Sequence, residues 1–346
     1  LLLVLAGAVV WGWLLPGPAA LSGPPELGPV MAEVDGVHPT RAVQALEQAW
    51  APGVGFLDKY PALGSALFGV VVSAVAPELP SAEVWLALPR DQRRLEEWRL
   101  AEAVSRALAA QRGLSRLAMG LALGVALALV AQVLRRAGVE HDGVVRLGAA
   151  VSALCLGAAY PMAYYASTAN VDALALLPAL VALWASLDGR HRLAAVALAL
   201  ATAIKDPYFA LGPVVLLGAW LDGPGRARRV GVSAAVGLGA YAVATGALLA
   251  PGCWWSHVQY LVSGGVQGVE RIDPADPAQW PGLLAYAGRL ILGAQGLIVV
   301  VLGCAGLLAA SRRDRAGVAR LVLAVGLSVA LFVVPAGFAY ARFLLL

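Results

Sequence analysis

The sequence predicts an all-α, polytopic integral membrane protein. Of its 346 residues, 60% are hydrophobic and only 13% are charged, and the mean hydropathy is +0.77. Soluble globular domains carry about a quarter charged residues, so this composition excludes an ordinary soluble domain. Long apolar runs also recur along the chain, and short arginine-rich loops separate several of them. We therefore expect one transmembrane domain over residues 1–346, built as a helical bundle.

The apolar runs are the candidate spans. A helix needs about 20 residues to cross the hydrocarbon, so the shorter runs must include neutral flanking residues. The runs are residues 1–15, 114–134, 147–159, 171–187, 193–204, 209–221, 230–250, 283–310 and 318–334. The first run lacks the positive start of a signal peptide, which favours a first transmembrane helix. Because the chain begins at Leu1 and stops inside an apolar stretch, we expect a fragment incomplete at both ends.

Basic residues divide unequally between two alternating sets of loops. One set holds Arg135, Arg136, Arg146, Arg190, Arg192, Arg226, Arg228, Arg229, Arg312, Arg313, Arg315 and Arg320. The other set holds Lys205, Arg271, Arg289 and Arg342. Short loops rich in basic residues stay in the cytoplasm, so the first set is predicted to be cytoplasmic. The second set then faces the periplasm or the cell exterior, across a bacterial-type inner or plasma membrane.

The orientation predicts a long external segment over residues 16–113 and a second external loop over residues 251–283. The stretch 61–76 is short for a span, and counting it as one would reverse the first helix, so we expect a juxtamembrane or re-entrant helix there. Residues 90–112 place apolar side chains at helical spacing between Arg and Glu. This pattern predicts a helix that lies in the membrane interface or packs on the rest of the protein.

The cysteines and the charge exclude several kinds of site. Cys155 and Cys304 lie in apolar runs and only Cys253 lies in a loop, which indicates neither a disulfide framework nor a thiolate metal site. The net charge of +4 is spread over short loops and forms no single patch, so we expect no nucleic-acid binding. Anionic lipid headgroups are the expected neighbours of these arginines. The sequence has no nucleophile elbow, P-loop or dinucleotide-binding motif.

Polar residues gather at the predicted outer ends of the helices. They are Glu33, Asp35, His38, Asp58, Lys59, Tyr164, Tyr165, Asn170, Asp172, Lys205, Asp206, His257 and Gln259. Each type has an ordinary explanation, because Asn170 or Asp172 can cap a helix, Lys205 can extend to the interface, and tyrosines form interfacial belts. Their shared side, opposite the arginines, nevertheless predicts a functional site.

The order of these motifs resembles the GT-C superfamily of membrane glycosyltransferases. An acidic residue in the first external loop is followed by the Asp58-Lys59 motif, a Tyr-rich motif ending in Asp172, and Lys205 at the end of a later helix. Over residues 1–225 the pattern is most similar to the aminoarabinose transferase and protein O-mannosyltransferase families, glycosyltransferase family 39/83-like. Those families use polyprenyl-phosphate sugars as donors.

The resemblance implies roles for individual residues. Asp35 matches the catalytic carboxylate and is the expected base, Asp172 matches an acidic residue of the third outer turn, and Lys205 matches a lysine near the lipid phosphate. Gly36 stands where the family has Glu, so Glu33 or His38 can share or replace the role of base. The expected substrate-binding residues are Glu33, His38, Asp58, Lys59, Tyr165, Asn170, His257 and Arg271.

The implied reaction transfers a sugar to a hydroxyl of a protein, lipid or glycan acceptor, with inversion at the anomeric carbon. Such transfer needs a base for the acceptor and positive charge for the departing phosphate, which Lys205 would supply. Lys59 and Arg271 are candidate second cations, which Asp172 could orient. No cofactor is implied, and a divalent cation at Asp172 has low priority because no tight cluster of ligands is present.

Two other functions compete with this hypothesis. A transporter or flippase for a lipid-linked or small polar substrate would place its key charges near the middle of the membrane. Here they lie at one set of helix ends, which favours the enzyme. A non-catalytic membrane scaffold predicts that Asp35→Asn and Lys205→Ala leave function intact.

Overall fold

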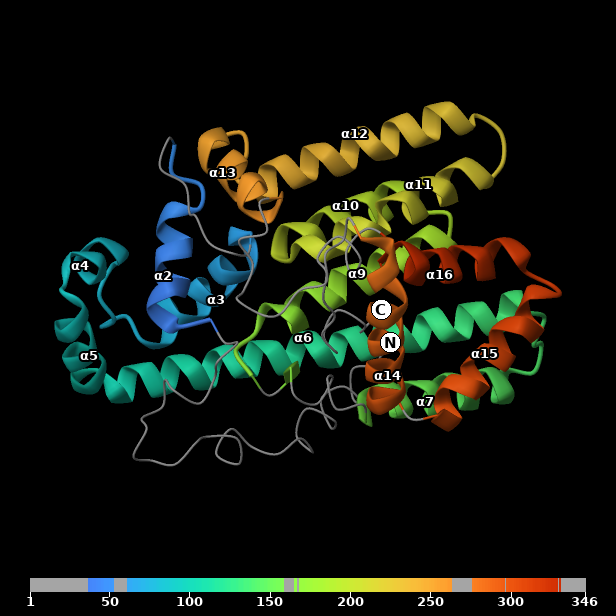
Figure 1. Ribbon diagram of the computed structural model, residues 1–346, viewed down its shortest axis with the longest axis horizontal. Helices are drawn as coiled ribbons and strands as arrows, with labels where there is room; N and C mark the ends of the chain where they lie inside the picture. Colours follow the sequence, from blue (N-terminus) through green and yellow to red (C-terminus); the bar gives the residue numbers. More distant parts are fainter. Residues whose placement is uncertain are drawn as a thin grey trace.

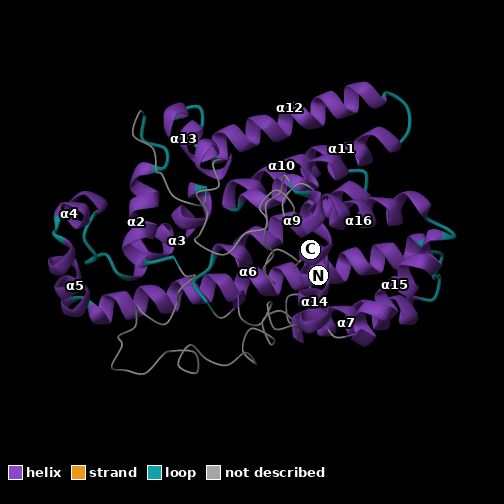
Figure 2. Cartoon of the chain, viewed as in Figure 1, coloured by secondary structure: helices purple, strands orange, loops and turns teal. Residues whose placement is uncertain are grey.

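The computed structural model describes residues 37–52, 61–158, 165–166, 168–262, 276–295, 297–328 and 330. Within these ranges all regular structure is helical, with no strand (Figure 2). The helices are α2 (Pro39–Gln48), α3 (Ala62–Val75), α4 (Ala82–Ala87), α5 (Arg90–Arg99), α6 (Ala101–Arg136), α7 (Asp142–Ala158), α9 (Val171–Leu187), α10 (His191–Ile204), α11 (Gly212–Leu221), α12 (Arg226–Ala244), α13 (Pro251–Val262), α14 (Trp280–Gln295), α15 (Leu297–Ser311) and α16 (Arg315–Ser328), with 3-10 turns η3 (Asp206–Leu211) and η4 (Pro277–Gln279). The all-α prediction is confirmed.

Helix α9 forms the centre of the core, between α6 and α10. Its alanines are buried around the whole helix. Five of them have no exposed surface: Ala173, Ala175, Ala179, Ala182 and Ala185. The neighbouring helix α10 presents a matching series of small residues, including Ala194 and Ala201. Small side chains let helix backbones approach closely, and this composition is typical of helix pairs within membranes.

Helix α6 joins two segments that the sequence analysis kept apart. Leu100 leaves helical geometry, with φ −99° and ψ 17°, so the predicted amphipathic helix over 90–112 is divided into α5 and the start of α6. From Ala101 no proline interrupts the helix, and it continues for 36 residues, about 54 Å at 1.5 Å per residue. Val104, Ala107 and Leu108 are buried in the core. The structure therefore shows the packed alternative for residues 101–112.

The segment before α6 packs over one end of the core. The Val37 amide donates to the Ala169 carbonyl at 2.7 Å, which attaches the chain ahead of α2 to the start of α9. Helix α3 packs between α2 and the core, and Gly64 lies against Val171 and Ile204. Figure 1 shows α2, α3, α4 and α5 together at this end. The predicted juxtamembrane helix over 61–76 is α3.

The arginine-rich loops meet at the opposite end of the bundle. Arg136 contacts the Leu187 carbonyl and lies 3.7 Å from Asp314, and Arg313 donates to the Gly138 carbonyl at 3.5 Å. Arg320 donates to the Ser186 carbonyl at 3.1 Å. In Figure 1 the end of α6 and the starts of α7, α10, α12 and α16 all lie at this end. The described loops are thus grouped as the charge bias predicts.

By length and apolar composition, α6 is the described helix that can cross a membrane. The apolar helices α3, α9 and α10, and the continuous segment η3–α11, are shorter. The predicted run 230–250 is divided between α12 and the turn before α13, where Gly246 has φ +71°. The run 283–310 is divided between α14 and α15. The polytopic architecture with these spans remains a prediction.

Candidate functional site

A buried ion pair joins the ends of α9 and α10. Helix α10 ends at Ile204, and Lys205 follows with extended geometry (φ −154°, ψ 119°) because Pro207 opens the next helical turn. The Lys205 Nζ donates to Asp172 Oδ1 in the first turn of α9. Lys205 is 2% exposed and Asp172 is 1% exposed. The two charges therefore form a neutral pair inside the protein.

Asn170 fixes the backbone at Asp172. Its side chain caps α9 by accepting a hydrogen bond from the Asp172 amide at 2.9 Å. A carboxylate in the first turn is also stabilised by the positive end of the helix dipole. Within the part of the chain that the structure describes, Asp172 Oδ2 has no hydrogen-bond partner. This oxygen is the available acceptor of the pair.

The sequence hypothesis assigned the compensation of the Lys205 charge to a lipid phosphate. In the structure a carboxylate within the chain compensates it. Asp172 was expected to orient Lys59 or Arg271, but it contacts Lys205 instead. An entering phosphate would therefore have to share Lys205 with Asp172.

A second acid–base pair lies directly beside the first. Asp206 follows Lys205 in the chain, and its two carboxylate oxygens lie 3.2 and 3.3 Å from His257 Nε2 in α13. Both residues are buried. Asp206 was among the polar residues at the predicted outer helix ends, but no role was expected for it. The signal available was its position between a lysine and a proline, which fixes it at the turn after α10.

His38 caps α2 at the same end. Its Nδ1 accepts from the Thr40 amide at 3.3 Å, and its ring stacks on Trp85 with centroids 6.3 Å apart. Burial lowers the pKa of His38 to about 4, so the imidazole is neutral at physiological pH. A neutral imidazole is a possible base, and its position beside the Val37–Ala169 contact places it near the start of α9.

Polar residues of α6 were missed by the sequence analysis. Gln111 has no exposed surface and donates to the Val37 carbonyl at 3.1 Å. The next residue, Arg112, is 7% exposed, and Ser115 is fully buried. A buried arginine is rare unless it has a specific partner or function. The signal was a Gln-Arg pair directly before a long apolar run.

Apart from His38 at the α2 cap, the structure places the predicted site residues in three groups. Asn170, Asp172, Lys205 and His257 belong to the two neighbouring pairs and their cap. Tyr165 is 8% exposed and packs in the hydrophobic core rather than on the surface of the bundle. The predicted Glu33, Asp35, Asp58, Lys59 and Arg271 lie outside the described residues.

The two pairs form one buried polar cluster. It combines a lysine, two carboxylates and a histidine at the junction of α9, α10, η3 and α13. Among the described residues, no group of three or more His, Cys, Asp or Glu side chains could hold a metal ion. The residues of the two pairs can compensate charge and transfer protons.

Comparison with known proteins gives one family. A family model described as Glycosyltransferase family 87 matches residues 103–335, from the first turn of α6 to beyond α16. The match includes Asp172, Lys205, Asp206 and His257. No curated protein and no solved structure matches the chain.

The family match supports the GT-C resemblance at the level of a membrane glycosyltransferase family. It does not point to the aminoarabinose transferase or O-mannosyltransferase families in particular. It also extends through the second half of the chain, where the resemblance had reached only to residue 225. An enzyme is favoured over a transporter and over a scaffold.

Proposed function

Because this chain belongs to glycosyltransferase family 87, it is a glycosyltransferase, and we propose that its donor is a polyprenyl-phosphate sugar. The acceptor is a hydroxyl of a protein, lipid or glycan, and the reaction runs on the extracytoplasmic side with inversion. The single observation that carries this proposal is the buried Lys205–Asp172 pair at the helix ends opposite the arginine loops.

The pair supplies the cation that such a donor requires. When the bond from the anomeric carbon to the phosphate oxygen breaks, negative charge develops on the polyprenyl phosphate. Lys205 sits at a helix end in an apolar part of the bundle, where a charge-assisted hydrogen bond to a phosphate oxygen is stronger than in water. Asp172 keeps the lysine ammonium oriented while no donor is bound. The leaving phosphate then takes over one of its hydrogen bonds.

Asp35 is the proposed base for the acceptor hydroxyl. It precedes Val37 by two residues, and Val37 is held by the Ala169 carbonyl, three residues before Asp172. Val37, two residues after Asp35, is thus attached beside the ion pair. Deprotonating the hydroxyl as it attacks the anomeric carbon gives a direct displacement and inverts configuration. Glu33 and the neutral His38 are the alternative bases.

Other charged residues complete the proposed site. Lys59 and Arg271 are candidate second cations for the phosphate, and the buried Arg112 is a third. His257 and Asp206 form a pair that can position the sugar hydroxyls by hydrogen bonds, since each can donate or accept according to its protonation. The site needs no cofactor for this chemistry.

Release of the lipid phosphate tests the proposal. The full chain in lipid nanodiscs is mixed with a synthetic polyprenyl-phosphate sugar and a set of hydroxyl acceptors, and polyprenyl phosphate is measured over time. We expect release by the unchanged protein, and loss of roughly two orders of magnitude or more in Asp35→Asn, the range for a general base. Glu83→Gln, in α4 of the same external segment and exposed, is the matched control and should keep full activity.

Two outcomes would contradict the proposal at different points. Full activity of Asp35→Asn would remove this residue from the mechanism while leaving the donor class intact. Transfer from nucleotide sugars, with none from any polyprenyl-phosphate sugar, would overturn the donor class itself.

A further inference from the structure

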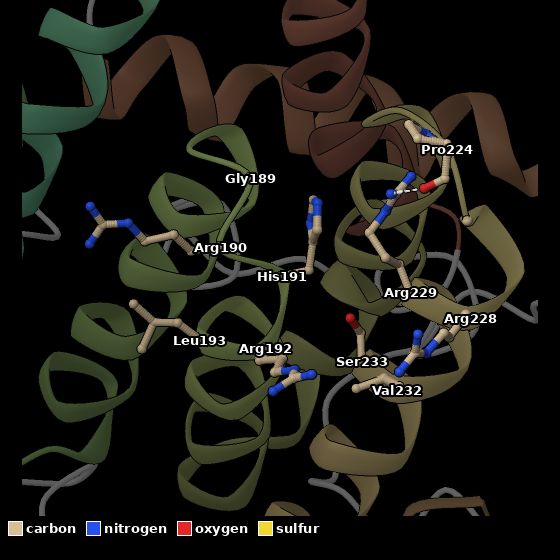
Figure 3. A pocket seen from close by; sticks show the side chains of 11 residues that line it. Gly189, Arg190, His191, Arg192, Leu193, Pro224, Arg228, Arg229, Val232 and Ser233 are labelled. Carbon is tan, nitrogen blue, oxygen red and sulfur yellow. Dashed lines mark hydrogen bonds between the residues drawn. The ribbon is translucent and has the colours of Figure 1, made fainter.

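A pocket of 610 Å³ opens at the arginine-rich end of the bundle, between the first turns of α10 and α12. Its lining comes from the α9–α10 turn and the α11–α12 turn, and Figure 3 shows the side chains of both. The volume is in the range of small-molecule sites. The lining includes Arg190, His191, Arg192, Arg228 and Arg229, and it includes no carboxylate.

Two of these arginines have structural partners. Arg229 donates to the carbonyls of Ala219, at 3.0 Å, and of Gly223, at 2.5 Å, and so closes the α11–α12 turn. Arg190 lies 2.6 Å from Asp188 and stacks over the Trp184 ring. Their charges remain at the pocket, but their side chains are held by the protein.

Arg192 and Arg228 are different. Both are exposed, and among the described residues neither has an ion pair or a hydrogen bond from its guanidinium. They approach the pocket from opposite walls, one from α10 and the other from α12 (Figure 3). Two unpaired guanidinium groups facing one cavity repel each other unless an anion lies between them.

The floor of the pocket carries a buried polar group. His191 is 8% exposed, and its Nε2 lies 3.2 Å from Asp222 Oδ2. Asp222 is also bonded to Arg320 at 2.5 Å, which fixes the two turns and α16 relative to one another. His191 Nδ1 is buried without a hydrogen-bond partner in the described part of the chain. Figure 3 shows the ring standing between the two arginine turns.

We propose that this pocket binds the phosphate group of an anionic membrane lipid. Arg192 and Arg228 would hold the phosphate oxygens, and the amino-terminal ends of α10 and α12 add favourable backbone dipoles. The apolar Leu193 and Val232 of the lining would contact the lipid beyond its phosphate. Trp184 and Trp220, each beneath an arginine, are the aromatic residues expected at headgroup level.

This site is separate from the proposed catalytic one. The pocket lies at the first turn of α10 and Lys205 follows its last turn, so the 14-residue helix of about 21 Å separates them. The lipid site does not depend on which sugar donor the enzyme uses. Its function is to attach this end of the bundle to an anionic membrane surface.

Lipid binding by the full chain tests the proposal. Detergent-solubilised protein is titrated with phosphatidylglycerol, phosphatidylcholine or inorganic phosphate, and bound molecules are counted by native mass spectrometry. We expect preferential binding of phosphatidylglycerol and a roughly tenfold or greater loss of affinity in Arg192→Gln/Arg228→Gln. The matched control is Arg312→Gln/Arg315→Gln, which removes the same charge from the α15–α16 turn at the same end without changing the lining. It should bind as the unchanged protein does.

A steric variant gives an independent test. Val232→Trp fills the pocket without changing charge and should also weaken phosphatidylglycerol binding. Saturable binding of inorganic phosphate that depends on Arg192 and Arg228 would support the anion site and assign it to a soluble phosphate. Equal binding by all variants, or an equal loss in the two arginine pairs, would overturn the proposal.

Discussion

At the residue scale, Lys205 is accommodated in an apolar region because Asp172 lies against it. Burying a charged side chain among apolar residues costs several kcal/mol of folding free energy unless the charge is paired. Lys205 and Asp172 are both buried, and each compensates the charge of the other. The sequence brought both residues to the same end of the bundle. It did not give their pairing, because 33 residues separate them and the contact depends on how α9 and α10 are rotated about their axes.

Breaking this pair should destabilise the protein strongly. In Lys205→Met the Asp172 carboxylate is left buried and uncompensated, and we expect a loss of about 3–5 kcal/mol in unfolding free energy. Lys205→Met/Asp172→Leu removes both charges and should recover most of that loss. Thermal unfolding in detergent measures both, and glycosyl transfer is assayed on the same samples.

The double variant separates stability from chemistry. If the charges take part in the reaction, it is stable and inactive. A stable and fully active double variant would reduce the pair to a structural role. A double variant no more stable than the single one would show that the two side chains are not coupled.

His38 should make stability depend on pH. Its pKa is about 4 in the folded protein and about 6.5 when unfolded, so between these values the unfolded state binds more protons. Stability therefore falls as pH decreases from 6.5 to 4, by at most about 3 kcal/mol for this group. His38→Asn retains a side chain that can cap α2 but does not titrate.

The measurement is the unfolding temperature of both proteins from pH 8 to pH 4. The two curves should coincide in shape above pH 7, and the variant should lose less stability below 6.5. Parallel curves over the whole range would show that His38 takes up its proton equally in the folded and unfolded states.

At the element scale, the sequence predicted where helices stop better than where they continue. The break after Ile204 was predicted, since Lys205, Asp206 and Pro207 interrupt two apolar runs. The continuation of α6 from Ala101 to Arg136 was not, because its first turns are polar on one side and resemble a separate amphipathic helix. Residues 101–112 continue α6 because Val104 and Leu108 are buried against other helices. That contact is not a local property of the sequence.

The packing of α2 on α3 depends on Gly69. A Cβ at this position would collide with the Ala42 backbone carbonyl, which cannot move without shifting α2. Gly69→Ala should therefore cost about 1–3 kcal/mol of unfolding free energy. Gly113→Ala, in the open middle of α6, meets no atom within 4 Å and should be neutral or stabilising by up to about 1 kcal/mol. Thermal unfolding compares the two. Equal stability of both variants would contradict the close approach of α2 and α3.

At the scale of the whole molecule, the arginines of the short loops lie at one end of the bundle, and the Lys205–Asp172 and Asp206–His257 pairs lie at the other end (Figure 1). The sorting concerns these groups alone, because the exposed Arg99 and Arg106 lie at the end with α2 and α3, and the buried Arg320–Asp222–His191 cluster lies among the arginine loops. The alternation of loops predicted this sorting. The number of basic residues in each loop hardly changes when a helix boundary is misplaced by a few residues. Which polar groups touch inside each end was beyond it, since Asp206–His257 spans 51 residues and Gln111–Val37 spans 74.

The two ends should lie on opposite sides of the membrane. In a background with Cys155, Cys253 and Cys304 replaced by alanine, Glu83→Cys places a thiol on α4, and Arg312→Cys places one in the α15–α16 loop at the other end. Both positions are exposed, so each thiol can react.

A membrane-impermeant maleimide should label Glu83→Cys in intact cells and Arg312→Cys only after permeabilisation, because the short basic loops are retained in the cytoplasm. The permeabilised sample is the control for reactivity at both sites. Labelling of both positions from the same side would contradict a bundle that crosses the bilayer between its two ends, and with it the extracytoplasmic position proposed for Lys205.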